Sequence, residues 1–378
     1  SGIAGFYVSR AELGADGLYH INGVIPPDEF ALGPLVDGER AGVNDSIYTN
    51  FVAKVALSFA TEVARRTSNT AKPEWAEVAA KMAQPYDETV DRHPEYCGYQ
   101  WGETVKQADV ILLPYPLGMQ MNRSTQINDL EYYKTVTDST GPAMTWGKFC
   151  IAYLDIGELE KAAEMLPRSF ANVKPPFDVW TETPKGGATN FITGAGGFLQ
   201  TVLNGYFGVR IMRDKLRLLP VLMDGASKMV ARGLWYQGCR FSASVDSERV
   251  AVWMEPDSAC KLNVQEEDTG RTTQIDDQAK LTFAWRTEGG KRVPIVLHLS
   301  AVSGQDAVRD IVDASELRGA LRDVGKWQAS PSALAMAAGV FCAAILVAAW
   351  VTRMHRSRQE ADGRSQRCVE ASPGYEQL

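Results

Sequence analysis

The chain has 378 residues, of which 45% are hydrophobic and 9% aromatic, with 39 basic and 46 acidic side chains and a net charge of −7. This composition excludes intrinsic disorder as the main state, because a disordered chain is poor in aromatic and branched apolar residues. An acidic chain without a basic run in its first 350 residues matches a phosphate backbone poorly, so we expect no nucleic-acid partner. Four His and six scattered Cys, without any CxxC pair, predict no metal site, and we expect no cofactor.

The first part of the chain, residues 1–205, predicts helices joined by long loops. Helices are expected at 47–66, 74–82, 143–155, 156–166 and 198–206. In the first of these, the apolar residues at helical spacing are Phe51, Val52, Val55, Phe59 and Val63. Because no strand pattern interrupts these helices, we expect an all-helical domain whose Pro- and Gly-rich loops are better candidates for chemistry than its helices.

From residue 206 the pattern changes to short alternating runs. These runs are FGVRI, KLRLLP, RFSASV, RVAVWM, KLTFAW and PIVLHLS. Turn residues separate them at the spacing that is typical of an all-β sandwich. We therefore expect a multidomain chain in which an α domain is followed by a β-sandwich over residues 206–305.

The C-terminal part contains a long uncharged run. A linker is expected over 306–332, a transmembrane helix over 333–352 and a tail over 353–378. The run rises about 28 Å as a helix, close to the ~30 Å thickness of the hydrocarbon layer. Basic residues follow it at once, among them Arg353 and Arg356. The positive-inside bias therefore predicts a single-pass membrane protein with a cytosolic tail and an extracellular or lumenal N-terminal part.

Two loops carry carboxylates in settings that suit sugar chemistry. Asp28 and Glu29 follow two prolines, which stiffen the loop that must hold them. Glu182 stands two residues after Trp180, and sugar C–H faces stack on aromatic rings. A glycosidase needs one carboxyl that is still protonated when substrate binds. The alternative for both glutamates is an ordinary exposed loop acid, as most Glu are.

Several motifs occur in the order of a known family. They are GVIPPDEF at 23–30, NDSIYTN at 44–50, VKQADVILL at 105–113, WTE at 180–182, GGATN at 186–190 and TGAGG at 193–197. Together they resemble the central domain of glycoside hydrolase family 65, in the branch of acid trehalases and protein-glucosylgalactosylhydroxylysine glucosidases. The resemblance covers residues 1–300 and implies a partial (α/α)6 barrel followed by a β-sandwich.

The resemblance also implies roles for the motif residues. Glu29 would be the general acid and Glu182 the general base, while Asp28 would support Glu29. Lys106 and Gln107 would bind the sugar. The implied reaction is inverting hydrolysis of a terminal α-linked glucose with release of β-glucose, and its two carboxyl groups should stand about 6.5–9.5 Å apart.

Alternatives to hydrolysis by this chain remain open. A phosphorylase of the same family would use phosphate instead of water, but the negative charge of Glu182 would repel phosphate. The chain lacks an initiator Met and the N-terminal half of the family's domain, so we expect a C-terminal fragment that is inactive by itself, or an inactive sugar-binding ectodomain. Residues 31–41 look like an insertion. The substrate is expected to be trehalose, slightly preferred, or a glucosyl-galactosyl-hydroxylysine glycoside.

Overall fold

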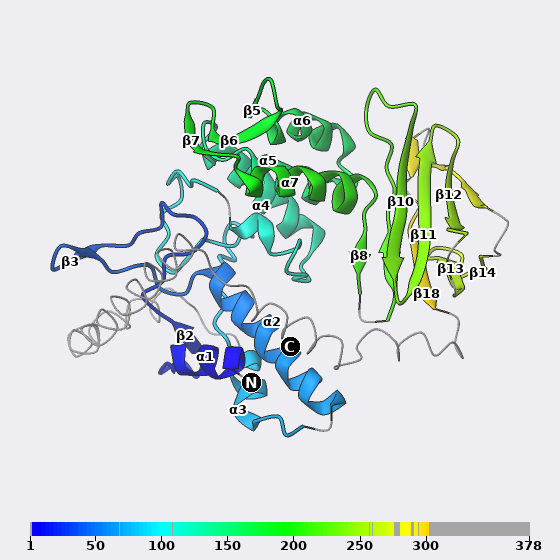
Figure 1. Cartoon of the computed structure of the whole chain (residues 1–378). Coiled ribbons are helices and arrows are strands. Elements are labelled where there is room, and N and C mark those ends of the chain that lie inside the picture. Colours follow the sequence, from blue (N-terminus) through cyan, green and yellow to red (C-terminus); the bar gives the residue numbers. More distant parts are fainter. Residues whose placement is uncertain are drawn as a thin grey trace, which may run out of the picture. The chain divides into compact units, whose positions relative to one another are not determined.

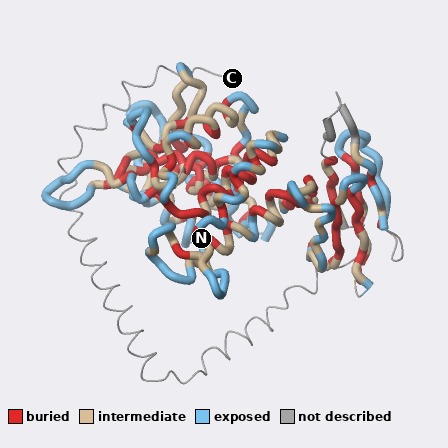
Figure 2. The backbone as a smooth tube through the Cα atoms, turned by 90° about the horizontal axis from the view of Figure 1, so that it is seen from above, coloured by how far each residue is buried: buried red, intermediate tan, exposed pale blue. Residues whose placement is uncertain are grey.

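The computed structural model describes residues 2–301, except residues 68, 108, 213, 257, 259, 276–279, 289–290 and 294. In this range helices dominate the first two hundred residues and strands the remainder (Figure 1). Buried backbone runs through the middle of the helical region and along the strands of the later sheets, as Figure 2 shows.

Three helices near the N-terminus form a first packed group. They are α1 (Gly2–Arg10), α2 (Ile47–Arg66) and α3 (Pro73–Ala80), and α1 and α3 lie beside α2 in Figure 1. The hydroxyl of Ser46 caps α2 by accepting the N–H of Thr49. A short antiparallel pair, β1 (Ala11–Leu13) and β2 (Tyr19–Ile21), joins α1 to the next loop. The core of this group contains Ile21, Ala53, Leu57, Ala64, Trp75 and Val78.

The face that α2 buries differs in part from the one predicted. Phe51 is buried as expected, whereas Val55, Phe59 and Val63 are exposed within the described structure, Phe59 to 68%. The helix carries two apolar stripes, and α1 and α3 pack on the one that contains the small residues Ala53 and Ala64. Small side chains allow closer helix packing, which a count of apolar spacing alone does not detect.

A second helical group surrounds one almost fully buried helix. Its members are α4 (Arg123–Val136), α5 (Met144–Asp155), α6 (Leu159–Ser169), α7 (Ile192–Gln200), the π-helical turn η2 (Thr201–Tyr206) and the short 3-10 helix η1 (Val110–Leu112). Helix α5 contacts each of the other members. Its residues Phe149, Cys150 and Ile151 are fully buried, since it has neighbours on all sides. The sequence predicted α5 and α6 but not α1 or α4.

Two small sheets interrupt the helices. Residues 31–41, the expected insertion, contain a hairpin formed by β3 (Leu35–Val36) and β4 (Glu39–Arg40). A three-stranded antiparallel sheet follows α6 and contains β5 (Val173–Lys174), β6 (Val179–Thr183) and β7 (Gly186–Thr189). The expectation of a region without strands was therefore wrong, and β6 carries Glu182.

Two larger antiparallel sheets follow η2 and share one core. The first has the order β10-β11-β12-β15 and the second the order β14-β13-β18-β9-β8. Their bounds are β8 Arg210–Ile211, β9 Leu216–Leu218, β10 Lys228–Tyr236, β11 Cys239–Asp246, β12 Arg249–Met254, β13 Leu262–Glu266, β14 Thr272–Gln274, β15 Leu281–Ala284 and β18 Leu297–Ala301. A separate hairpin contains β16 (Arg286–Glu288) and β17 (Lys291–Val293). The shared core includes Phe241, Val245, Val252, Leu262 and Leu299, and a disulfide joins Cys239 to Cys260.

Two expectations about architecture need correction. A partial (α/α)6 barrel is not seen, because the seven α-helices of the described residues form two packed groups with strands and long loops between them. The predicted transmembrane helix at 333–352 lies outside the described residues. Among the helices that are described, none is both long enough and apolar enough to cross a membrane, so the single-pass arrangement and its sidedness are not supported.

Candidate functional site

The loop that carries Glu29 is held by the carboxyl group of its neighbour. Asp28 is 2% exposed, and its Oδ1 accepts the N–H of Phe30 at 3.2 Å and the N–H of Lys106 at 2.8 Å. Burial raises the pKa of Asp28, although these hydrogen bonds act in the opposite direction. Asp28 therefore ties the Glu29 loop to the Lys106 segment, while the side chain of Glu29 itself stays 66% exposed.

Lys106 brings the two expected catalytic glutamates together. Its ammonium nitrogen lies 2.7 Å from Oε2 of Glu29 and 3.3 Å from Oε1 of Glu182. These two glutamates are far apart in the sequence. The ion pair with Glu29 raises the pKa of Lys106, so the ammonium form is favoured. Since both oxygens contact one nitrogen, they are at most 6.0 Å apart, the sum of these two distances, which is shorter than the about 6.5–9.5 Å expected for an inverting pair. The ammonium therefore lies between the two carboxylates.

Glu182 is positioned by the β6–β7 hairpin. Its Oε2 accepts the N–H of Ala188 at 3.2 Å, and this bond, followed by Lys106, lowers the pKa of Glu182. Strand β7 requires a glycine at position 187, where φ is +82°. A Cβ at Gly187 would lie 2.8 Å from Oε2 of Glu182, so the hairpin has no room for a side chain there. The result is an ionised carboxylate, as a general base requires.

The other two predicted sugar-binding residues have different surroundings. The amide nitrogen of Gln107 donates to the carbonyl of Pro27, so Gln107 supports the Glu29 loop. The indole nitrogen of Trp180 donates to the carbonyl of Ser169 at 3.2 Å, and its ring packs against Phe198 with centroids 5.7 Å apart. These contacts pack the half-buried Trp180 of β6 against α7, and its sugar-binding role stays a prediction.

Two buried carboxyl groups behind the loop were missed from the sequence. Asp109 and Glu95 are 0% and 1% exposed, and burial raises the pKa of each well above its usual value. Asp109 stands in the VKQADV motif, which was a usable signal, whereas nothing in the sequence around Glu95 indicated such a position. No group of three His, Cys, Asp or Glu side chains suited to a metal occurs in the described part of the chain.

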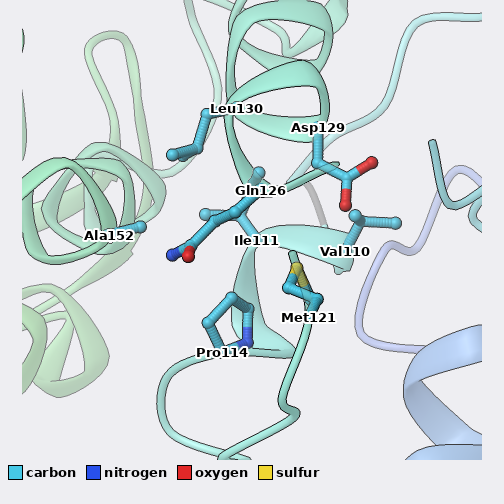
Figure 3. Close-up of a pocket in the computed structure, with 8 residues that line it drawn as sticks. All are labelled: Val110, Ile111, Pro114, Met121, Gln126, Asp129, Leu130 and Ala152. Carbon is cyan, nitrogen blue, oxygen red and sulfur yellow. The ribbon is translucent and has the colours of Figure 1, made fainter. Parts of the chain in front are cut away.

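A small hollow lies away from these residues. It is lined by residues of η1, α4 and α5, including Val110, Asp129 and Leu130 (Figure 3). Its volume is about 10 Å³, which is about the space of a single water molecule. It is too small for a sugar, so the candidate site is the group around Lys106.

Known proteins share both sequence and fold with this chain. The family model of the glycosyl hydrolase family 65 central catalytic domain matches residues 2–101. A protein-glucosylgalactosylhydroxylysine glucosidase from Danio rerio is 44% identical over 253 residues, which are 66% of this chain and 37% of that protein. Over residues 2–101 the chain thus matches glycosyl hydrolase family 65. The predicted resemblance to this family and to its hydrolase branch is confirmed.

Other curated relatives match over shorter parts. A kojibiose hydrolase from Mucilaginibacter mallensis is 35% identical over 56% of this chain and 30% of its own length. A periplasmic acid trehalase from Saccharomyces cerevisiae is 31% identical over 51% of this chain and 16% of its own length. The chain spans little more than a third of the length of the Danio rerio protein and a smaller share of the other two.

One solved structure shares the fold. The structure of a "putative kojibiose phosphorylase from human microbiome" superimposes with a TM-score of 0.59 and covers 75% of this chain and 43% of that chain. The two sequences are 16% identical, so the likeness concerns the fold alone.

Proposed function

We propose that this chain contributes the acid and the base of an inverting α-glucosidase. The observation that carries the proposal is the convergence of Glu29 and Glu182 on Lys106, from loops far apart in the sequence. Glycosidases cleave with a pair of carboxyl groups, and an inverting pair stands about 6.5–9.5 Å apart. The proposal therefore requires the exposed side chain of Glu29 to move away from Glu182 when substrate replaces Lys106. The relatives named as glucosidase, kojibiose hydrolase and acid trehalase support the same reaction class.

The proposed reaction uses one carboxyl group for each proton transfer. Glu29, in its protonated form, gives its proton to the glycosidic oxygen of the leaving group. Glu182, as a carboxylate, takes a proton from a water that attacks the anomeric carbon on the opposite face. The α-glycosidic bond breaks, a bond from that carbon to the water oxygen forms, and β-glucose is released.

The ion pairs of the free site bear on this reaction. The ammonium of Lys106 occupies the space between the carboxylates, where an attacking water and a sugar would have to lie. Substrate hydroxyl groups would therefore displace Lys106 from Glu29 and bind it instead. This gives Lys106 the sugar-binding role that the family resemblance implies.

The substrate proposed first is the terminal glucose of a glucosyl-galactosyl-hydroxylysine glycoside. Relatives with 39–44% identity carry the corresponding glucosidase name, whereas the acid trehalase from Saccharomyces cerevisiae is 31% identical. This reverses the slight preference for trehalose that the sequence alone suggested. Phosphorolysis is disfavoured because the ionised Glu182 would repel phosphate.

Glucose release from the native protein, purified at the length that its source produces, tests the proposal. Glucosylgalactosylhydroxylysine and trehalose would be supplied with and without phosphate, and the first anomer would be identified by NMR. We expect β-glucose without phosphate, and a loss of about 10²–10⁴-fold in kcat for Glu29→Gln with substrate binding retained. A requirement for phosphate, or unchanged turnover in Glu29→Gln, would contradict the proposal.

A further inference from the structure

A line of three buried carboxyl groups leads to the backbone of the Glu29 loop. Oδ2 of Asp109 accepts the N–H of Asp28 at 3.1 Å. The N–H of Asp109 donates in turn to Oε1 of Glu95 at 3.1 Å. The carbonyl of Glu95 accepts the N–H of Ile47 at 3.0 Å, at the first residue of α2. The line therefore connects the start of a long helix to the loop of the proposed acid.

The protonation of the inner pair follows from its burial. Oδ1 of Asp109 and Oε2 of Glu95 are buried and have no hydrogen-bond partner within the described structure. Two such carboxylates would each need a compensating donor or cation, and their mutual repulsion adds to the cost of ionisation. Burial first, and the neighbouring carboxyl groups second, raise the pKa of Glu95. The inner pair is thus favoured in the neutral form.

The exposed side chain of Glu29 depends on this line for its position. Glu29 itself makes one described side-chain contact, to Lys106, which a substrate would remove. Its backbone is fixed on both sides: Asp109 holds the N–H of residue 28, and the carboxyl group of Asp28 holds the N–H of residue 30. After the ammonium group of Lys106 is displaced, these buried bonds still hold the loop, together with the bond from Gln107 to Pro27.

We propose that Asp109 and Glu95 are positioning residues that fix the proposed general acid Glu29 through Asp28. The inference rests on the proposed function, because it concerns the acid of that reaction. Asp109 must accept a hydrogen bond but need not be ionised. An amide of the same shape at residue 109 should therefore replace the carboxyl group, and its NH₂ would supply a donor on the side of the unpaired oxygens.

Three variants of the native protein test the proposal. Asp109→Ala removes the acceptor for the N–H of Asp28. Misplacement of a catalytic group by about 1 Å costs ~10²-fold in rate, so kcat should fall by about 10- to 100-fold while KM changes little. Asp109→Asn should keep kcat within about 3-fold of the wild type, because it keeps the acceptor. The matched control is Asp246→Ala, because Oδ1 of Asp246 likewise accepts backbone N–H groups, from Glu248 at 2.9 Å and from Arg249 at 3.0 Å, in the turn between β11 and β12. Its kcat per folded molecule should stay unchanged.

Hydrogen exchange gives a readout that requires no turnover. The amide of Asp28 should be protected in the wild type and in Asp109→Asn, and should exchange at least 10-fold faster in Asp109→Ala or, if that variant does not fold, in Asp109→Ser. An unprotected Asp28 amide in the wild type, or wild-type kcat in Asp109→Ala, overturns the positioning role. Failure of the proposed function would give a different result from failure of the positioning role. Glu29→Gln would then remain active, while the amide of Asp28 would still be protected from exchange.

Discussion

Nζ of Lys106 lies 2.7 Å from Oε2 of Glu29, so the proposed acid is engaged by a cation in the free site. A glycosidic oxygen can reach this carboxyl oxygen only after the ammonium group has moved away. The site must therefore exchange this contact for contacts with substrate before the acid can act. Lys106 is 18% exposed, so the sugar can reach it.

Replacing Lys106 by Met tests whether this ammonium binds the sugar. Met keeps much of the length of the side chain but removes the charge and the donors. Hydrogen bonds to charged groups contribute about 1.5–3 kcal/mol, so kcat/KM for glucose release should fall by about 10- to 100-fold. The matched control is Lys161→Met, because Nζ of Lys161 lies 2.8 Å from Oε1 of Glu131 outside the site. Equal losses in both variants would contradict a specific role for Lys106.

The sequence predicted much of the local structure and the family. Helix α2 spans the predicted residues 47–66, and runs such as RVAVWM form strands, because apolar periodicity is a local property. The family motifs contain Glu29, Lys106 and Glu182, which the ion pairs of Lys106 join. Periodicity alone could not have joined them, since the contacts are long-range.

What the sequence did not predict depends on tertiary packing. Val55 and Phe59 fit the apolar period of α2, yet the neighbouring helices pack on another stripe. Glu95 is a charged residue in a loop, for which exposure is the ordinary expectation, and only the fold buries it. The contact of the Trp180 ring with Phe198 of α7 is also long-range in the fold, so the sequence pattern around Trp180 did not indicate it.

Gly187→Ala tests how strictly the β6–β7 hairpin positions Glu182. The new Cβ would lie 2.8 Å from Oε2 of Glu182, so the carboxylate must move, and kcat should fall by ~10²-fold. Gly186→Ala is the matched control: φ is +134° there, so backbone strain is also expected, but no atom lies within 4 Å of its added Cβ. Both variants should lose stability by about 1–3 kcal/mol. If Gly186→Ala lost as much kcat as Gly187→Ala, strain alone would explain the effect.

His20 gives a pH-dependent contribution to stability. Nδ1 of His20 lies 2.8 Å from Oδ2 of Asp45, and its Nε2 lies 3.1 Å from Oδ1 of Asp16. The hydrogen bond with Asp45 is the main cause that raises the pKa of His20 from 6.5 to about 9. Because the folded-state pKa is the higher one, the stabilisation is fully present below pH 6.5 and is lost as the pH rises through about 9.

Urea unfolding of the wild type and of His20→Gln between pH 6 and pH 10 measures this contribution. Gln cannot be protonated, so the variant should lack the loss of unfolding free energy that the wild type shows between pH 6.5 and 9. After allowance for the partial solvent exposure of the imidazole, the difference between the two proteins should change by about 1–3 kcal/mol across that window. If the unfolding free energies of the two proteins ran parallel with pH, the ion pairs of His20 would contribute nothing to folding. If the wild type instead gained stability over the variant as the pH rises, burial would lower the pKa of His20.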